Sequence, residues 1–379
     1  MVKVSVVIPV YNVEDFLNEC LDSIVNQTLE DIEIICINDG STDNSLNILN
    51  EYAQKDDRFT ILSQENGGHA VATNNGMKLA KGEYLYLMDS DDILSLNALE
   101  DTYKVAKEKD VDFVIFQSTN YYMDTNEYIK KENYSMNRLA DFVGDKVFNW
   151  KDIKDYIFTI TVTPWSKLYN REFVEKSGAK FPEGLIFDDN VFFWEVLFSA
   201  KRITFHRDYL FTRRWYSSSS TKAGDKRFID SLTIYNMVWD VFKKYGTFDE
   251  FKVYLYNTKV KVAHIRFSKI KEEFKELYFE EMKQNFSNLR NDSIFEDFYI
   301  NLIDRHRNIF DFVMNSENHM EYSLKLEYYD LIKTNKKLNK NNKELTKKLK
   351  KQKKINNELL NSNSWKLTKP FRSITNRFR

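Results

Sequence analysis

Strand-like and helix-like segments alternate through the first hundred residues, and this alternation constrains the fold more than any other feature. Residues 2–10, 32–37, 60–62 and 84–88 are short apolar runs, and the segments between them carry apolar side chains at helical spacing. A β-branched run such as residues 2–10 is typical of a strand that is buried on both faces. The alternation predicts an α/β fold with a mainly parallel sheet flanked by helices.

Polar side chains follow these predicted strands at the points where the strands end. Tyr11 comes after the first strand, Asp39 after the second, and Asp89 and Asp91 after the fourth. Ligands of parallel sheets bind in the crevice beyond the carboxyl ends of the strands. Carboxylates placed there suit Mg²⁺ or Mn²⁺, which often bind one or two carboxylates together with the phosphates of a substrate. The alternative for residues 89–92 is a solvated turn that caps the next helix.

Three common signatures of nucleotide-binding proteins are absent from the sequence. No GxGxxG follows the first predicted strand, GxxxxGK(S/T) occurs nowhere, and there is no Gly-rich, basic opening loop of the kind found in sugar nucleotidyltransferases. A dinucleotide-binding fold and a P-loop are therefore unsupported.

Three motifs occur in order within about ninety residues: VSVVIPVYNVEDFLNECLDSIVNQT, INDGSTDNS and ENGG…NNGMKLAKGEYLYLMDSDD. Together they resemble the nucleotide-sugar-binding half of family 2 glycosyltransferases, which have the GT-A fold. The resemblance implies a nucleoside-diphosphate sugar as the donor, with a UDP-sugar as the default. It also implies that Pro9, Tyr11 and Glu14 lie around the nucleobase and ribose, and that Asp39 accepts a hydrogen bond from the base.

The same resemblance implies a metal-dependent enzyme. Asp91 would be the principal ligand of Mn²⁺ or Mg²⁺, and Asp89 would lie near the ribose and the metal. One position departs from the family pattern, because many members carry an Arg immediately before the Asn that Asn74 matches, and this chain has Thr73 there. Asn74 is a predicted donor-binding residue. Without that Arg, we expect either that other residues bind the diphosphate or that the donor differs.

A second block, residues 164–190, resembles the acceptor half of the same enzymes. In this family a Glu-Asp pair stands where Asp188-Asp189 stands here. The resemblance implies that Asp189 is the catalytic base and that Asp188 supports the acceptor site. A placed carboxylate that takes a proton from the attacking hydroxyl contributes roughly 10²–10⁴-fold. The alternative is that both residues only cap the helix that follows them.

Aromatic side chains are abundant, with 29 Phe and 22 Tyr. Trp165 is the one predicted to stack on an acceptor sugar. Most of the others recur at helical spacing between residues 228 and 330, which is typical of a core.

A basic and serine-rich segment lies between residues 211 and 220. The family often places Arg and Ser there on a loop that closes over the donor diphosphate. Positive charge directed at a departing pyrophosphate stabilises such a transfer. Arg213 or Arg214 is the predicted contact, with the serines at 217–220 as weaker candidates. The alternative is a polar surface loop, and His206 nearby is interpreted as structural.

The 379 residues are enough for two domains and an extension. We expect a GT-A domain at 1–222, with a donor half (1–118) and an acceptor half (119–222). A helical domain at 223–322, a basic coiled-coil helix at 323–360 and a basic-aromatic tail at 361–379 follow. Cys20 and Cys36 fall in apolar patterns, which indicates buried thiols and fits a reducing compartment. The first residues read as a core strand and not a signal peptide, and no stretch of eighteen apolar residues predicts a transmembrane helix.

The C-terminal region concentrates positive charge, with 16 Lys/Arg and two Glu in residues 333–379, although the whole chain has a net charge of −1. Leucines recur every seven residues along it, at Leu324, Leu331, Leu338 and Leu345, and Leu359 keeps the register. Asn at the other core position specifies a parallel dimer at some cost in stability. A weak homodimeric coiled coil is therefore predicted. The alternative is a single solvated helix or a partly disordered tail.

The last residues mix aromatic and basic side chains, including Trp365 and Phe371. This mixture suits a bilayer surface, where each basic residue contributes about 1 kcal/mol on an anionic membrane. The ending also resembles tails of other surface-glycan glycosyltransferases. Nucleic-acid binding is the competing interpretation, but no RNA- or DNA-binding motif accompanies the lysines. We therefore expect a cytoplasmic protein bound peripherally to the inner face of the cell membrane.

Two functions follow from these patterns. The first is a metal-dependent inverting glycosyltransferase acting on a cell-surface glycan or a lipid-linked acceptor. The second is a non-catalytic, nucleotide-binding scaffold that its basic coiled coil tethers to a membrane or to partners. The complete set of strand-end aspartates favours the enzyme, while Thr73 and Asp188 leave room for the scaffold.

Overall fold

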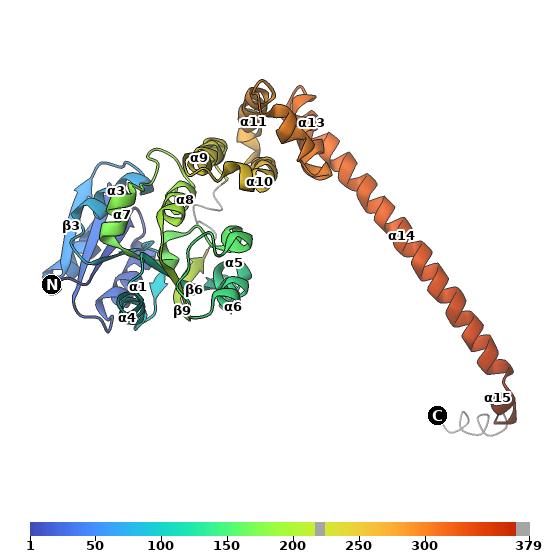
Figure 1. Cartoon of the computed structure of the whole chain (residues 1–379), viewed down its shortest axis with the longest axis horizontal. Coiled ribbons are helices and arrows are strands. Elements are labelled where there is room, and N and C mark those ends of the chain that lie inside the picture. The colour runs from blue at the N-terminus through green and yellow to red at the C-terminus, as the bar shows by residue number, and fades with distance from the viewer. Residues whose placement is uncertain (217–223, 369–379) are drawn as a thin grey trace. The chain divides into compact units, whose positions relative to one another are not determined.

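The computed structural model of this chain describes residues 1–216 and 224–368 (Figure 1). Its contacts divide it into two compact units, Met1–Arg307 and a second unit that begins at Asn308. The predicted end of the GT-A domain, residue 222, and the last part of the predicted tail lie outside the described residues.

The first unit is built on a nine-stranded sheet with the order β3-β2-β1-β4-β8-β6-β9-β5, in which β7 pairs with β6. The strands are β1 (Val4–Val10), β2 (Ile32–Asp39), β3 (Phe59–Gln64), β4 (Tyr84–Leu87), β5 (Ile93–Leu94), β6 (Phe113–Tyr122), β7 (Glu127–Ile129), β8 (Lys167–Asn170) and β9 (Ile203–Trp215). The predicted α/β fold is confirmed. Parallel pairing joins β1 to β2 and β4, β2 to β3, and β6 to β9, whereas β5, β7 and β8 pair antiparallel. Antiparallel neighbours need no crossover helix, so the regular strand–helix alternation ends after β4.

Eight helices accompany the sheet up to residue 199: α1 (Glu14–Val25), α2 (Ser45–Lys55), α3 (His69–Leu79), α4 (Ala98–Lys109), α5 (Glu132–Ser135), α6 (Asn137–Val143), α7 (Arg171–Ser177) and α8 (Asp189–Ser199). Short 3₁₀ turns lie at η1 (Lys154–Thr159) and η2 (Pro164–Ser166). Alternate side chains of β1 share one core with the buried face of α1. That face carries Leu17, Cys20, Leu21 and Ile24, which are spaced by three and four residues.

Helix α3 packs on the opposite side of β1 and β2 from that core. Gly76 makes this close packing possible, because a Cβ there would lie 2.3 Å from Cγ1 of Val7. The helix begins after Gly68, whose φ of 86° is in the left-handed region that favours glycine. These two glycines fix where the first residue of α3, His69, meets the end of the sheet.

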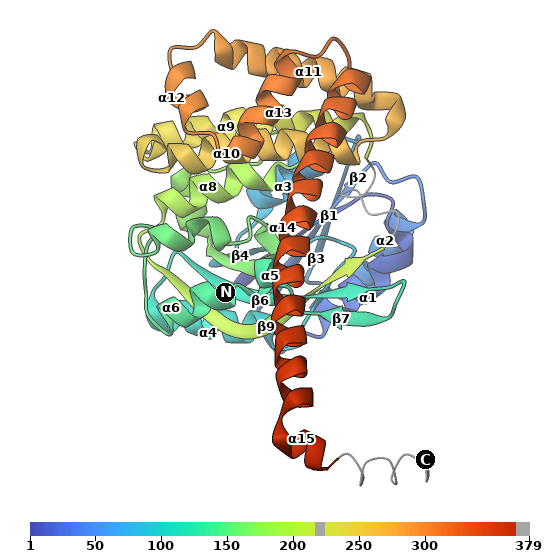
Figure 2. The same cartoon turned by 90° about the vertical axis from the view of Figure 1, so that its right-hand side faces the viewer.

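The chain after β9 folds into a layer of helices (Figure 2). It comprises η4 (Lys226–Ile229), α9 (Asp230–Lys244), α10 (Phe248–Lys269), η5 (Glu272–Phe274), α11 (Lys275–Arg290) and α12 (Phe295–Ile300), with α13 (Asp304–Met314) at the boundary of the two units. Helix α9 packs on α8 and α10. The interpretation of the aromatics at helical spacing as core is confirmed for Phe228, Trp239 and Phe242, which are 1%, 4% and 0% exposed.

The second unit is dominated by α14 (His319–Asn361), a continuous helix of 43 residues (Figure 1). Asn318 caps it, because its side-chain oxygen accepts a hydrogen bond from the backbone N of Glu321 at 3.0 Å. Buried residues of α14 are confined to its first turns, at Tyr322 and Leu326. A short helix, α15 (Asn363–Leu367), follows. Among the residues described, no helix has both the length and the apolar composition needed to span a bilayer.

Candidate functional site

Three carboxylates converge directly after β4. One oxygen from each of Asp89, Asp91 and Asp92 lies within 4.8 Å of the others. The buried Asp92 accepts a hydrogen bond on Oδ1 from the backbone N of Arg214 at 2.6 Å. Oδ2 of Asp91 accepts one from the hydroxyl of Tyr216, also at 2.6 Å. The end of β9 is therefore attached to this acidic cluster, and Asp92 serves that attachment.

Burial and crowding disfavour the charged forms of Asp91 and Asp92. Burial and then the charge of Asp89 raise the pKa of Asp91, while burial and then the charges of Asp91 and Asp89 raise the pKa of Asp92 well above its usual range. A bound cation would relieve this repulsion. Because all the donors are carboxylate oxygens, the cluster fits a hard divalent ion such as Mg²⁺ or Mn²⁺.

A second cluster links this site to the start of α8. Nδ1 of His69 lies 3.0 Å from Oδ2 of Asp188, and Nε2 of His69 lies 3.6 Å from Oδ1 of Asp89. Asp189 belongs to the same group, since ligand atoms of His69, Asp188 and Asp189 lie within 4.8 Å of one another. His69 therefore bridges the strand-end aspartates and the predicted base.

The charges of this second cluster oppose one another. Burial opposes the protonation of His69, but Asp188 and Asp89 outweigh it and raise the pKa of His69 well above its usual value. Burial and the neighbouring charge of Asp188 raise the pKa of Asp189 to about 8, against the opposite effect of His69. Once ionised, a carboxylate with such a pKa is a stronger proton acceptor than an ordinary one.

Sequence reasoning missed His69. Its position was the available signal, because it follows the Gly67-Gly68 pair beyond β3 and opens a helix. The contact with Asp188 spans 119 positions, however, and no local pattern predicts it.

Asp39 shapes the turn that presents His69. Its carboxylate is 2% exposed and accepts hydrogen bonds from Nε2 of Gln64 and from the backbone N of Gly67 and Gly68, each at 2.8 Å. These bonds hold the glycine pair in place at the start of α3. Both oxygens of Asp39 are thus engaged within the protein, and its bond to a nucleobase stays a prediction.

The opening loop after β1 is held to the segment that follows β2. Oε2 of Glu14 accepts a hydrogen bond from the backbone N of Asn44 at 2.7 Å, and Asp43 accepts one from the backbone N of Glu14 at 2.9 Å. Tyr11 is 51% exposed, while Pro9 is partly buried within β1. The ring of Tyr11 is therefore accessible to a ligand, beside a loop that these hydrogen bonds hold in place.

Asn74 and Trp165 face the protein interior. The side chain of Asn74 is 4% exposed, donates to the carbonyl of Phe181 at 2.9 Å and accepts from its backbone N at 3.1 Å. Trp165 is 2% exposed and stacks on Phe211, with ring centroids 4.3 Å apart. The structure thus gives Asn74 the task of joining the donor and acceptor halves, and it gives Trp165 no free face for a sugar.

The two predicted arginines have different surroundings. The guanidinium of Arg214 is buried against Glu19 and the carbonyl of Phe16, so only its backbone meets the acidic cluster. The guanidinium of Arg213 lies 4.4 Å from the ring of Trp215 and bonds the hydroxyl of Tyr134. Burial lowers the pKa of Arg213, but Tyr134 and the cluster aspartates outweigh this and raise it. Arg213 is therefore the better placed of the two for an anionic ligand.

Two further candidates lie away from the acidic clusters or beyond the described residues. His206 belongs to a separate group with Asp101 and Asp208. The serines predicted at 217–220 lie outside the described residues.

Comparison with known proteins places these features in a family. The family model described as "Glycosyl transferase family 2" matches residues 5–176 of this chain. Glycosyltransferase GlyG of Streptococcus pneumoniae serotype 4 is 36% identical over 219 residues, which are 56% of this chain and 71% of that protein. The poly(ribitol-phosphate) beta-glucosyltransferase of Bacillus spizizenii is 35% identical over 214 residues, which are 55% of this chain and 31% of that protein. This chain therefore spans most of GlyG but only about a third of the second relative.

Solved structures support the same fold. The structure of S. aureus TarS 1-349 superposes on this chain with a TM-score of 0.65 at 18% identity. The superposed region covers 87% of this chain and 91% of the TarS chain. TarS 1-349 has also been crystallised with UDP and with UDP-GlcNAc. From the matched motifs, the relatives and the fold, the chain belongs to glycosyltransferase family 2 and is a glycosyltransferase with the GT-A fold.

Proposed function

We propose that this enzyme moves a sugar from a UDP-sugar to a hydroxyl of a cell-surface glycan or lipid-linked acceptor, with inversion at the anomeric carbon and with Mn²⁺ or Mg²⁺ as cofactor. The observation that carries the proposal is the link through His69 between the strand-end aspartates and the start of α8. It brings together the aspartates that would bind a cation and the carboxylate that would accept a proton. The TarS complexes with UDP and the poly(ribitol-phosphate) relative support the donor and acceptor classes.

Asp91 and Asp89 would hold the divalent ion, and Asp92 would keep β9 against them. When bound, the cation neutralises charge on the departing diphosphate. Tyr216 orients Asp91 through its 2.6 Å hydrogen bond. Arg213 would add positive charge on the same side, and Tyr11, Pro9, Glu14 and Asp39 would form the edge that receives the nucleoside.

Asp189 would take the proton of the acceptor hydroxyl. As the hydroxyl oxygen bonds to the anomeric carbon, the bond from that carbon to the diphosphate breaks and the diphosphate leaves with the electron pair. One displacement of this kind inverts the anomeric centre, and it needs a base but no nucleophilic side chain. Burial and Asp188 raise the pKa of Asp189 to about 8, which makes its ionised form a stronger base than an ordinary carboxylate.

Turnover measurements test the proposal. UDP release from UDP-sugars, measured with Mn²⁺ and a glycan acceptor, should collapse in Asp91→Ala and in Asp189→Asn. Asp208→Asn is the matched control, since Asp208 is an exposed carboxylate outside both clusters. Normal turnover in both site variants would refute the assigned roles. The scaffold alternative predicts that UDP binds in calorimetry while no acceptor yields a product.

The second unit is proposed to form a parallel homodimer through α14. The five heptad leucines are all 53–66% exposed. In the same heptad register, the positions beside the seam from residue 332 to 346 are uncharged, at Ile332, Thr334, Asn339, Asn341 and Thr346. Lys336, Lys337 and Lys340 fall on the outer face, so repulsion between two copies is small over this stretch, whereas Lys348 and Lys353 flank the seam further along.

The basic end is proposed to hold the enzyme on the inner face of the cytoplasmic membrane. Each Lys or Arg near an anionic surface contributes about 1 kcal/mol. Co-sedimentation with phosphatidylglycerol vesicles should depend on residues 361–379 and fall as salt rises. Binding that survives deletion of these residues, or equal binding to neutral phosphatidylcholine vesicles, would contradict this role.

A further inference from the structure

The residue immediately before the Asp188-Asp189 pair has an unusual backbone conformation. Phe187 has a φ of 66°, in the left-handed region. A side chain with a Cβ adopts this region at a cost, and the residues found there are mostly Gly, Asn and Asp. Such a conformation persists only where the surrounding structure holds it, and it is concentrated at functional sites. The contacts of Phe187 therefore bear on how the pair after it is placed.

The ring of Phe187 is held by two side chains of the helical layer. The guanidinium carbon of Arg266, on α10, lies 3.9 Å from the centroid of that ring. The ring of Phe228, on η4, meets the ring of Phe187 edge to face, with centroids 5.7 Å apart. The guanidinium of Arg266 also lies 5.3 Å from the centroid of Phe228. A cation over an aromatic face is attracted by the quadrupole of the ring, so Arg266 holds both rings in place.

The backbone on either side of the Phe187 ring is also bound. The N–H of Ile186 donates to Oδ2 of Asp230, at the start of α9, at 3.1 Å. The carbonyl of Phe187 accepts from the backbone N and from Nδ2 of Asn190, at 3.3 and 3.0 Å. The helical layer therefore holds the segment that enters α8 in two ways, through an aromatic ring and through a backbone hydrogen bond.

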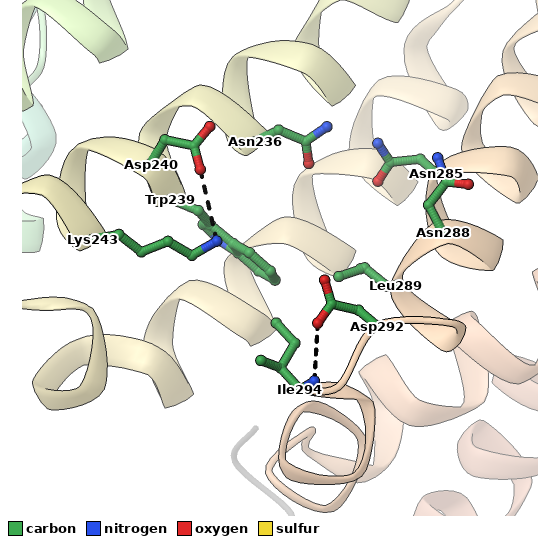
Figure 3. Close-up of a pocket in the computed structure, with 9 residues that line it drawn as sticks. All are labelled: Asn236, Trp239, Asp240, Lys243, Asn285, Asn288, Leu289, Asp292 and Ile294. Carbon is green, nitrogen blue, oxygen red and sulfur yellow. Dashed lines mark hydrogen bonds and ion pairs between the residues drawn. The ribbon is translucent and has the colours of Figure 1, made fainter.

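Among the described residues, Arg266 has no ionic partner, and its buried Nε has no hydrogen bond. By contrast, Lys243 of α9 pairs with Asp240 at 3.7 Å beside a pocket between α9 and α11 (Figure 3), and Lys252 of α10 pairs with Asp297 at 2.8 Å. Burial lowers the pKa of Arg266, because removing a cation from water without a carboxylate is unfavourable. Its contacts with the two aromatic rings offset this cost.

We propose that Arg266 is a positioning residue for the transfer reaction. By holding the ring of Phe187, it keeps the strained backbone that sets where Asp188 and Asp189 lie at the start of α8. A Phe187 that relaxed to negative φ would turn the peptide after it, and Oδ2 of Asp188 would leave its place 3.0 Å from Nδ1 of His69. Asp189 would then be misplaced for the acceptor hydroxyl. This role rests on the proposed function, because Asp189 is the proposed base.

Substitutions in the full-length chain test this role, with UDP release measured as for the site variants. Arg266→Met removes the cation but keeps a long side chain. We expect kcat to fall about tenfold while KM for the UDP-sugar changes little, because a misplaced base affects the chemical step and not donor binding. Arg266→Lys keeps a cation over the ring and should recover most of kcat. Lys261→Met, at an exposed position of α10, is the matched control and should turn over normally.

A double-mutant cycle separates positioning from a general loss of stability. Glycine adopts positive φ without strain, so Phe187→Gly no longer needs the cation to hold its backbone. Adding Arg266→Met to Phe187→Gly should therefore lower kcat less than about twofold, against about tenfold in the wild-type background. Equal reductions in the two backgrounds would mean that Arg266 does not act through Phe187, and would overturn the proposal.

Crystal structures test the geometry without any turnover. In Arg266→Met, the φ of Phe187 should become negative and Nδ1 of His69 should lie farther from Oδ2 of Asp188 than in the wild type. An unchanged φ and distance, a normal kcat in Arg266→Met, or no recovery in Arg266→Lys would each overturn the proposal. Should Arg266→Met lack a cooperative melting transition, Arg266→Gln replaces it. A wild-type chain that turns over no UDP-sugar would refute the transferase, and the crystal structures would then decide whether Arg266 holds Phe187.

Discussion

The acidic site and helix α14 are opposite in character, the first a cluster of buried charge and the second an exposed row of leucines. At the site, five carboxylates and one histidine crowd together, and burial together with the repulsion between carboxylates raises the pKa values of Asp91, Asp92 and Asp189. Along α14 a row of leucines is exposed. Charge without compensation favours binding of a cation, and apolar surface without cover favours binding of another helix. The two proposals can therefore be tested independently of each other.

The largest expected effect concerns the site. Asp189→Asn keeps the size of the side chain but removes its ability to accept a proton, so kcat should fall by roughly 10²–10⁴-fold while KM for the donor changes little. UDP release with Mn²⁺ measures both constants. A reduction no larger than that in Asp208→Asn would mean that the clustered carboxylates are structural.

Metal removal should be nearly as severe. Chelation of divalent ions should abolish turnover, and Mn²⁺ or Mg²⁺ should restore it, because Asp91 and Asp89 offer only hard oxygen ligands. The same ions should raise the melting temperature of the wild-type chain more than that of Asp91→Ala. Full activity in excess chelator would show that turnover does not need a bound cation.

The pH dependence should follow Asp189. Below its pKa of about 8 this carboxyl is protonated and cannot act as a base, so kcat/KM should fall about tenfold for each pH unit below that value and level off above it. Asp188→Asn removes the neighbouring like charge, so the midpoint should move to lower pH. A flat profile between pH 6 and pH 9 would exclude Asp189 as the titrating base.

A smaller effect is expected along α14. Leu338→Ala should weaken the proposed dimer at least about tenfold in sedimentation equilibrium, because each copy loses a buried leucine. Lys340→Ala on the outer face is the matched control. Turnover of a soluble acceptor should be unchanged in both. If the wild-type chain stays monomeric at the highest soluble concentration, the exposed leucines need another explanation.

The smallest effect should come from the helix cap. Asn318→Ala removes the acceptor for the backbone N of Glu321 and should destabilise the start of α14 by about 1 kcal/mol, as measured by chemical denaturation. Asn318→Asp keeps an acceptor and should retain most of the stability. An equal loss in both variants would show that the cap contributes little.

Much of the first hundred residues could be predicted from the sequence. The expected strands at residues 2–10, 32–37, 60–62 and 84–88 correspond to β1 to β4, with ends that differ by a few residues. Buried parallel strands are continuous apolar runs, which makes them recognisable without any partner. The strand-end aspartates were recognisable for a related reason, since polar residues directly after such runs must lie at one edge of the sheet.

Residues whose roles depend on distant contacts were predicted less well. Arg213 and Arg214 are adjacent and chemically identical, but only the second has its guanidinium buried against Glu19. The sequence suggested that Trp165 could stack on a sugar, but its ring stacks on Phe211 instead. Which way a side chain faces depends on elements far along the chain, and composition does not contain that information.

The sequence by itself determined the α/β class, the aspartates after β4 and the heptad of α14, because each depends on the spacing of residues that are close along the chain. Only the tertiary structure decided that His69 joins Asp89 to Asp188, that Asp39 holds the turn before α3, and that Arg266 lies over the ring of Phe187. These facts rest on contacts across many intervening residues. Such contacts exist only after the chain has paid the entropy of folding and packed its cores.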